Sequence, residues 1–248
     1  MLNYSQDVLF SGASGRGVAP HPEYEYGSVQ SLQPVRSSND RYKKAGGSVK
    51  GSRLIRYAAL AGIVASPVFA GIVTLLTIVE ADFMRTLGWN PRGPVIDWPS
   101  GLALGPYGWV MTATFLVCGG LMAFFAYGLK LALDDRLATT LLMLAGFAMM
   151  ALVFPSDPTI GRTAYTWHGF LHDAFFAVLG FTLMPGMLLL GAVFRRHERW
   201  KNLSLYTWAT LALVIPTFWL KGVAFYVFLV AILTWSEVVA FRLRAIQG

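Results

Sequence analysis

The sequence is poor in charged residues and has a single cysteine. Only 13% of its 248 residues are charged and 55% are hydrophobic, whereas soluble domains carry about 25% charged residues. So little charge leaves too little polar surface to coat a water-soluble particle of this size. Cys118 stands alone within an apolar run, which excludes an intrachain disulfide and a Cys₄-type zinc or iron–sulfur site. We therefore expect an integral membrane protein.

Six apolar segments follow Arg56. They cover residues 57–79, 106–130, 137–155, 168–194, 203–220 and 223–241. Each is near the ~20 residues that cross ~30 Å of hydrocarbon as a helix. Only Lys221-Gly222 separates the last two, but both together are too long for one crossing, so we expect a tight hairpin there. The predicted fold is all-α: a polytopic membrane bundle of six transmembrane helices.

Lysine and arginine positions predict the orientation of this bundle. If both termini are cytoplasmic, only Arg85, Arg92, Arg162 and Lys221 of the 20 basic residues lie outside, as the positive-inside rule requires. Five tryptophans then fall at the outer boundary, where indole rings prefer to lie: Trp89, Trp98, Trp109, Trp167 and Trp219. The net charge of +7 thus indicates topology, and we expect no nucleic-acid partner.

The first 50 residues differ from the rest of the chain. They contain eight Ser, six Gly and three Pro and no long apolar run, so they cannot bury enough apolar surface to offset their ordering entropy. We expect a cytoplasmic tail of low complexity over residues 1–52, disordered unless a partner binds it, and a six-helix domain over 53–248.

Small residues recur at spacing four on the first apolar segment, at Ala58, Gly62, Ser66 and Ala70. Such a face lets another helix approach closely. The simplest interpretation is tight packing within the bundle. The alternative is a contact with another subunit of a membrane complex, to which residues 1–50 would also contribute.

The residues best suited to chemistry lie between the third and fourth segments. His168 and His172 are four residues apart, so they share one helix face, and Asp157 lies on the connecting loop. These three are candidate ligands of a divalent metal, and with Asp173 they are candidate catalytic residues. Glu80 or Asp82 would lie at the same depth and orient them. Alternatively, Asp157-Pro158 forms a turn, Thr166 caps the helix, and the site contacts lipid headgroups or a partner.

Other cofactors and charges fit less well. Two histidines on one helix turn cannot bind opposite faces of one haem, and no other segment supplies a histidine, so haem is disfavoured. Few charges lie at mid-membrane depth, which disfavours an ion or proton transporter. Glu237, inside the last segment, needs a partner, and we expect a structural ion pair with Arg195 or Arg196.

Three stretches together resemble the bacterial membrane family called domain of unknown function 998. They are Gly105-Pro106-Tyr107-Gly108-Trp109, then Phe154-Pro155-Ser156-Asp157-Pro158, then Thr166, His168, Gly169 and His172. The resemblance covers about residues 57–243, and the family usually has Thr at the position of Ser156. It implies a six-helix bacterial inner-membrane protein without an established activity. The tail of residues 1–50 is not part of the resemblance.

Two hypotheses for the function follow. The preferred one is an accessory or scaffolding subunit of a larger membrane complex, because mid-membrane chemistry is missing and the tail would need a partner. The alternative is a metal-dependent hydrolase or transferase that acts on lipid headgroups at the outer face through Asp157, His168 and His172. In this alternative, the outer loop 81–105 would cover the site. The loop could equally pack on the bundle without covering anything.

Overall fold

The computed structural model describes residues 49–90, 99–158, 164–220 and 223–246. Their elements are α2 (Val49–Val79), α3 (Ala81–Thr86), the 3₁₀ helix η1 (Ser100–Leu104), α4 (Gly108–Leu133), α5 (Leu137–Ala151), α6 (Trp167–Arg196), α7 (Lys201–Leu220) and α8 (Val223–Ile246). Within these ranges every regular element is a helix, as predicted. The predicted tail of residues 1–50 lies outside the described residues, except for the start of α2.

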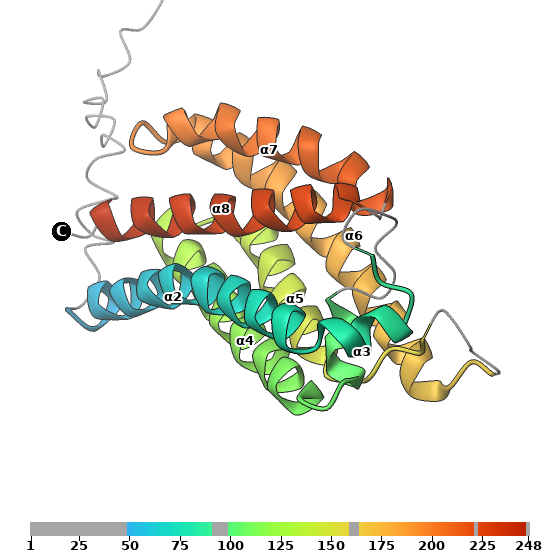
Figure 1. The fold of residues 1–248 in the computed structure, drawn as a ribbon. Coiled ribbons are helices and arrows are strands. Elements are labelled where there is room, and N and C mark those ends of the chain that lie inside the picture. Colours follow the sequence, from blue (N-terminus) through green and yellow to red (C-terminus); the bar gives the residue numbers. More distant parts are fainter. Residues whose placement is uncertain (1–48, 91–98, 159–163, 221–222, 247–248) are drawn as a thin grey trace, which may run out of the picture. The chain divides into compact units, whose positions relative to one another are not determined.

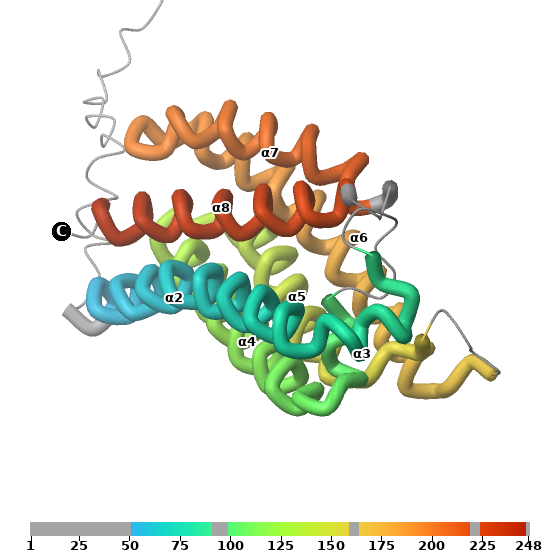
Figure 2. Tube along the Cα trace, in the orientation of Figure 1, coloured from blue at the N-terminus to red at the C-terminus, as the bar shows by residue number. Residues whose placement is uncertain are grey.

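The six long helices form a closed ring. Each packs against the next along the chain, in the order α2, α4, α5, α6, α7 and α8, and α8 packs back against α2 (Figure 1). Consecutive long helices run in opposite directions (Figure 2). One end of the bundle therefore contains α3, η1 and several ends of the long helices: the end of α2, the start of α4, the end of α5 and the starts of α6 and α8. We call this end the α3 end and the opposite one the α6–α7 end.

Each predicted apolar segment corresponds to one of these helices. The last two are separate helices, α7 and α8, that pack against each other, so the predicted hairpin is confirmed. The third is shorter than predicted, because α5 ends at Ala151 rather than at residue 155. Pro155 explains this end, since proline disfavours helical geometry at the residue before it and supplies no N–H.

Four of the described helices are long and apolar enough to cross a membrane: α2, α4, α6 and α8. The 15-residue α5 is apolar but short, and α7 is not among the four. The first turn of α7 begins with Lys201 and Asn202, which lowers its apolar character. Four apolar spans are enough to make this a multi-pass membrane protein.

The face of small residues on α2 packs inside the bundle. Ala58 and Ser66 are buried, and a Cβ added to Gly62 would lie 2.8 Å from the Cβ of Ala240 and from the ring of Phe125. The face therefore lets α2 fit closely between α4 and α8, as the simplest interpretation predicted. Ala58, Gly62 and Ser66 are not available to another subunit in this conformation.

Polar side chains join neighbouring helices in the half of the bundle toward the α6–α7 end. The indole N–H of Trp235 on α8 donates to the Thr207 hydroxyl on α7 (3.1 Å). The Ser204 hydroxyl donates to the Gly191 carbonyl (2.8 Å), and the indole N–H of Trp208 donates to the Leu188 carbonyl (3.1 Å), which both connect α7 to α6. The buried donors of Ser204 and Trp235 thus have partners, as a low-dielectric interior requires.

The predicted ion pair of Glu237 is not formed. In the part of the chain that the structure describes, the ion pairs are Arg85–Asp82 and Lys201–Glu198. Arg195 and Arg196 are exposed in the last turn of α6, where their charge favours the helix C-terminus. Glu237 is half-buried on α8, which packs mainly on α2 and α7 rather than on α6.

Two of the five tryptophans predicted at the outer boundary are exposed at helix starts, Trp109 on α4 and Trp167 on α6. Trp89 is buried instead, and its indole N–H donates to the Tyr226 hydroxyl (3.1 Å). Trp98 and the side chain of Trp219 lie outside what the structure describes.

Candidate functional site

Asp157 joins the loop after α5 to the first turn of α6. Its carboxylate is buried and accepts two hydrogen bonds from Thr166, one from the backbone N–H (2.9 Å) and one from the hydroxyl (2.6 Å). The Thr166 hydroxyl oxygen in turn accepts the Gly169 N–H (3.1 Å), which makes Thr166 the N-cap of α6, as predicted. Asp157 thus positions the cap that starts the helix.

Gly169 leaves the space that this carboxylate occupies. A Cβ at position 169 would lie 2.0 Å from Oδ2 of Asp157, closer than any real contact. The aspartate and the glycine are therefore a matched pair, and the start of α6 is built around the carboxylate.

The two predicted histidines do share one face of α6, and both face the loop after α5. Nδ1 of His168 lies 3.1 Å from the Pro155 carbonyl oxygen and 3.0 Å from the Thr166 hydroxyl. Nδ1 of His172 lies 2.7 Å from the Phe154 carbonyl oxygen. Because carbonyl oxygens only accept, both imidazoles carry their proton on Nδ1. The pair holds two successive carbonyls of the loop.

His172 has a second partner. Its Nε2 lies 2.9 Å from the hydroxyl oxygen of Ser100, the first residue of η1. With the proton on Nδ1, Nε2 of the neutral ring has a free lone pair, so the Ser100 hydroxyl donates to it. The result is a serine, a histidine and an orienting carbonyl in line, an arrangement that activates serine nucleophiles when a carboxylate takes the place of the carbonyl.

A cavity of about 190 Å³ opens beside this serine and histidine. Its polar lining comes from Ser100, Ser156, His172 and Asp173. Its apolar lining comes from η1 and its approach and from α2, α5, α6 and α8, namely Pro99, Phe69, Met149, Leu152, Phe176, Leu179, Leu183, Phe225, Phe228, Leu229, Ile232 and Leu233. The cavity is therefore an apolar chamber with one polar end. It exceeds the about 150 Å³ that accommodates a benzene ring in a protein core.

Ser156 contributes a hydroxyl without a partner to this chamber. The residue is 5% exposed, and its Oγ makes no hydrogen bond among the described residues. A buried hydroxyl that loses water without gaining a partner costs about 1–3 kcal/mol. Such a group in a cavity wall is where a bound molecule gains most from a complementary polar atom.

The predicted metal ligands are occupied in other ways. Across the described ranges no three His, Cys, Asp or Glu side chains are grouped as a metal site would need. Asp157 accepts from Thr166, and both ring nitrogens of His172 have partners within the protein. Asp173, the fourth predicted residue, is exposed and accepts the Tyr165 hydroxyl. The geometry is that of a hydrogen-bond network around a cavity rather than of a set of ligands.

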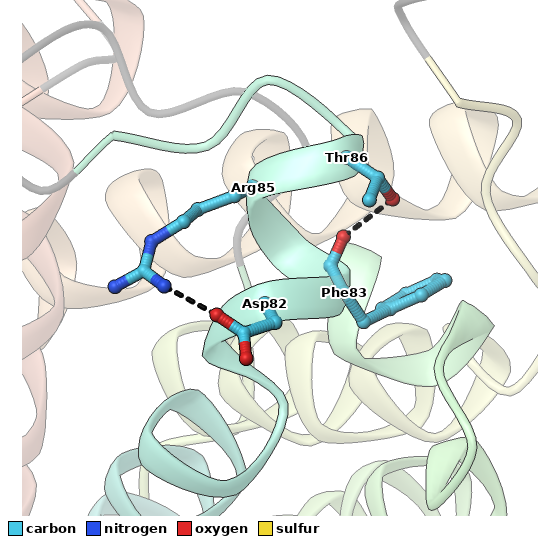
Figure 3. A network of polar contacts seen from close by, with 4 residues as sticks. All are labelled: Asp82, Phe83, Arg85 and Thr86. Carbon is cyan, nitrogen blue, oxygen red and sulfur yellow. Dashed lines mark hydrogen bonds and ion pairs between the residues drawn. The ribbon is translucent and has the colours of Figure 1, made fainter.

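The acidic residues at the end of α2 do not reach the histidines either. Glu80 is buried and accepts the Tyr107 N–H (2.6 Å), and Gly105 leaves it room, since a Cβ there would lie 2.3 Å from its Oε2. Asp82 pairs with Arg85 on the exposed surface of α3, beside the Thr86 hydroxyl that donates to the Phe83 carbonyl (Figure 3). Glu80 thus joins the end of α2 to the start of α4.

The predicted motifs therefore mark the two places where loops enter helices at the α3 end. Residues 63–244 match the family described as "Protein of unknown function (DUF998)". The chain belongs to the DUF998 family. No curated protein and no solved structure matches the chain. Membership in DUF998, together with the apolar helices, makes this an integral membrane protein, as the resemblance implied.

Two residues of the site were not predicted from the sequence. Ser156 stands in the Phe154–Pro158 stretch, and only its position next to Asp157 could have drawn attention to it. Ser100 lies 72 residues before His172, on a part of the outer loop for which the sequence showed no preferred contact. Pro99 and Ser100 line the cavity, so this described part of the loop forms part of the cavity wall.

Proposed function

We propose that this DUF998 protein binds a membrane lipid in the cavity at the α3 end of its bundle. The observation that carries the proposal is the hydroxyl of Ser156, which has no hydrogen-bond partner among the described residues and lies in the wall of an otherwise largely apolar chamber. An empty chamber forfeits dispersion contacts along its whole lining. A hydrocarbon chain restores them, and a polar atom at the end of that chain satisfies Ser156.

A second cavity lies next to this one, toward the α6–α7 end. It measures about 70 Å³ and shares Met149, Leu179, Leu183 and Ile232 with the first. A flexible chain that enters at the polar end has apolar walls ahead of it along the axis of the ring. A long hydrocarbon chain therefore fits this path better than a compact apolar molecule.

The proposed topology places the polar end of the cavity near the lipid headgroups. It has six crossings, with α5 and α7 spanning alongside the four longer helices, and both termini in the cytoplasm of a bacterium. The distribution of Lys and Arg supports it. Single cysteines at Arg85 and at Arg242 in a Cys118→Ala background test it: an impermeant maleimide added to intact cells should label only the first.

The lipid proposal is tested by counting the lipid molecules that remain on the purified protein. Native mass spectrometry of the full chain in mild detergent should show about one retained lipid per chain for a single site. Leu229→Trp puts an indole into the cavity lining and should abolish most of this retention. Val230→Trp adds the same bulk one residue later, at a position 64% exposed, and should retain the lipid. Equal retention by the two variants would contradict the proposal.

A role as an accessory subunit of a larger complex stays a prediction that does not depend on the cavity. The small-residue face of α2 packs within the bundle, so the prediction of an accessory role now depends on residues 1–50. Deletion of these residues should release the chain from a complex in native membrane extracts. Co-migration of the truncated chain with the same partners would contradict that role.

The metal-dependent hydrolase also stays a prediction. Elemental analysis of the purified protein tests it, because a protein-bound structural or catalytic metal should be present at close to one ion per chain. A content far below that value would remove the metal from consideration. It would leave the lipid site untouched, since none of its contacts involves an ion.

A further inference from the structure

The polar end of the cavity contains a hydrogen bond between Ser100 and His172 that lipid binding does not require. A structural histidine could be held by the Phe154 carbonyl alone, but Nε2 of His172 also accepts a hydrogen bond from the Ser100 hydroxyl, whose oxygen lies 2.9 Å away. His172 is 4% exposed and Ser100 is half-buried, so this hydrogen bond is partly shielded from competing water. Nucleophile, base and orienting group are in the order that acyl-transfer chemistry uses.

We infer that Ser100 is a nucleophile, with His172 as its general base, toward the carboxylic ester of a lipid bound in this cavity. The inference rests on the proposed lipid site, which it deepens by naming the substrate class. The hydrocarbon chain would occupy the apolar chamber, and the ester carbonyl would lie at the polar end, beside Ser100. The Ser156 hydroxyl lines the same cavity, makes no hydrogen bond within the part of the chain that the structure describes, and supplies the donor that a developing oxyanion needs.

Hydrolysis of the ester through an acyl–Ser100 intermediate needs neither a cofactor nor a redox partner. Oγ of Ser100 bonds to the ester carbon while its proton passes to Nε2 of His172. The tetrahedral intermediate collapses, the bond to the leaving alcohol breaks, and the alcohol oxygen takes the proton from Nε2. Water then attacks the acyl–Ser100 ester, gives one proton to Nε2, and releases the fatty acid as that proton returns to Oγ. The proton on Nδ1 stays there throughout, and its hydrogen bond to the Phe154 carbonyl fixes the ring.

The carbonyl has one consequence that a carboxylate would not have. It orients the imidazole but carries no full charge, so it stabilises the transient imidazolium less than an aspartate does. We therefore expect slow turnover and efficient single modification of Ser100 rather than rapid hydrolysis. Labelling by a covalent probe is accordingly a more sensitive readout than product release.

The test uses the full chain in lipid nanodiscs and a fluorophosphonate with a long alkyl chain. Attack by Oγ of Ser100 forms an O–P bond and expels fluoride, and the adduct is located by peptide mass spectrometry. The wild type should carry one adduct, on Ser100. Ser100→Ala should carry none, and His172→Gln should react at least about 100-fold more slowly, as expected for loss of a general base. Ser204→Ala, which removes a hydroxyl bonded to Gly191 on the α6–α7 connection, should react like the wild type.

The outcomes separate the two proposals. Wild-type protein that retains lipid but is not modified on Ser100, or is modified on another residue, overturns the nucleophile and leaves the lipid site standing. Modification of Ser100 that is equally fast in Leu229→Trp overturns the lipid site, because the probe's chain then does not use the cavity. His172→Gln also removes the hydrogen bond to the Phe154 carbonyl and so changes the fold as well as the base. Ser100→Ala with an unchanged melting temperature therefore decides whether the adduct belongs to this hydroxyl.

Discussion

The two ends of the bundle use their polar side chains for different purposes. Toward the α6–α7 end, Ser204, Thr207, Trp208 and Trp235 each bond to a neighbouring helix. A small cavity of about 70 Å³ there is lined in part by Ser236, whose hydroxyl has no hydrogen-bond partner among the described residues. At the α3 end, polar groups surround a chamber of about 190 Å³. One end is built to hold helices together and the other to hold something between them.

The difference has a physical cause in how the chain enters its helices. Near the α6–α7 end, α6 and α7 follow each other closely in sequence, so their side chains meet directly. At the α3 end, η1 and the loop after α5 lie between helix ends, and the cavity is lined from both. Four sets of variants test this account, from the largest expected effect to the smallest.

Gly169→Ala should have the largest effect, since the new Cβ would collide with the buried carboxylate of Asp157. We expect a loss of about 3 kcal/mol in the free energy of unfolding, as for a severely overpacked site. Gly71→Ala is the matched control, because nothing lies within 4 Å of its added Cβ, and it should be neutral or stabilising by up to about 1 kcal/mol. Chemical unfolding in detergent micelles measures both. Equal stability of the two variants would remove the Asp157–Gly169 fit from the account.

Asp157→Asn should cost about 2 kcal/mol, because one of the two oxygens that accept from Thr166 becomes an NH₂ group that cannot accept. Asp173→Asn changes an exposed carboxylate on α6 and should alter the free energy of unfolding by no more than about 0.5 kcal/mol. Thermal melting of the two variants side by side checks this order. The reverse order would show that Asp173 rather than Asp157 carries the start of α6.

Thr207→Val should cost about 1 kcal/mol by removing the acceptor of the Trp235 indole N–H. Its effect should be confined to stability, because Thr207 does not line the larger cavity and touches the smaller one only through its partner Trp235. Lipid retention should equal that of the wild type in native mass spectrometry. Loss of lipid from this variant would mean that the two ends are not independent.

Ser156→Ala should have the smallest effect on stability and the opposite sign. It removes a buried hydroxyl that has no partner among the described residues, so the lipid-free protein should be unchanged or more stable by up to about 1 kcal/mol. Lipid retention should fall about fivefold, the equivalent of one hydrogen bond of about 1 kcal/mol. Lower stability together with full retention would show that Ser156 serves the fold and not a ligand.

Local sequence patterns were enough to predict the helices but not the site. Apolar runs near the length of one crossing located the six long helices, Thr166 was identified as a cap from its residue type, and the spacing of His168 and His172 placed them on one face. Each of these features depends on residues within a few turns of one another. The helix of the third segment ended early because of Pro155, which lay inside the predicted range.

What could not be predicted depends on contacts between distant segments. The partner of His172 lies 72 residues away, and the pairing of Glu237 with Arg195 or Arg196 failed because α8 packs on α2 and α7. Two imidazoles on one face are equally compatible with a metal and with a pair of carbonyls. The position of the loop after α5 decides which of the two the imidazoles contact. That position depends on contacts between distant segments, so local sequence patterns do not predict it.

The most direct test of the central claim is to find where a lipid chain lies in the protein. A phospholipid with a photoreactive diazirine near the end of its acyl chain is retained by the purified chain, illuminated, and its adducts are mapped by mass spectrometry. The account predicts adducts on cavity residues of α8 such as Phe228, Leu229 and Leu233, lost in Leu229→Trp. Adducts confined to outward residues such as Val227 and Val230 would mean that lipid only surrounds the bundle, and would contradict it.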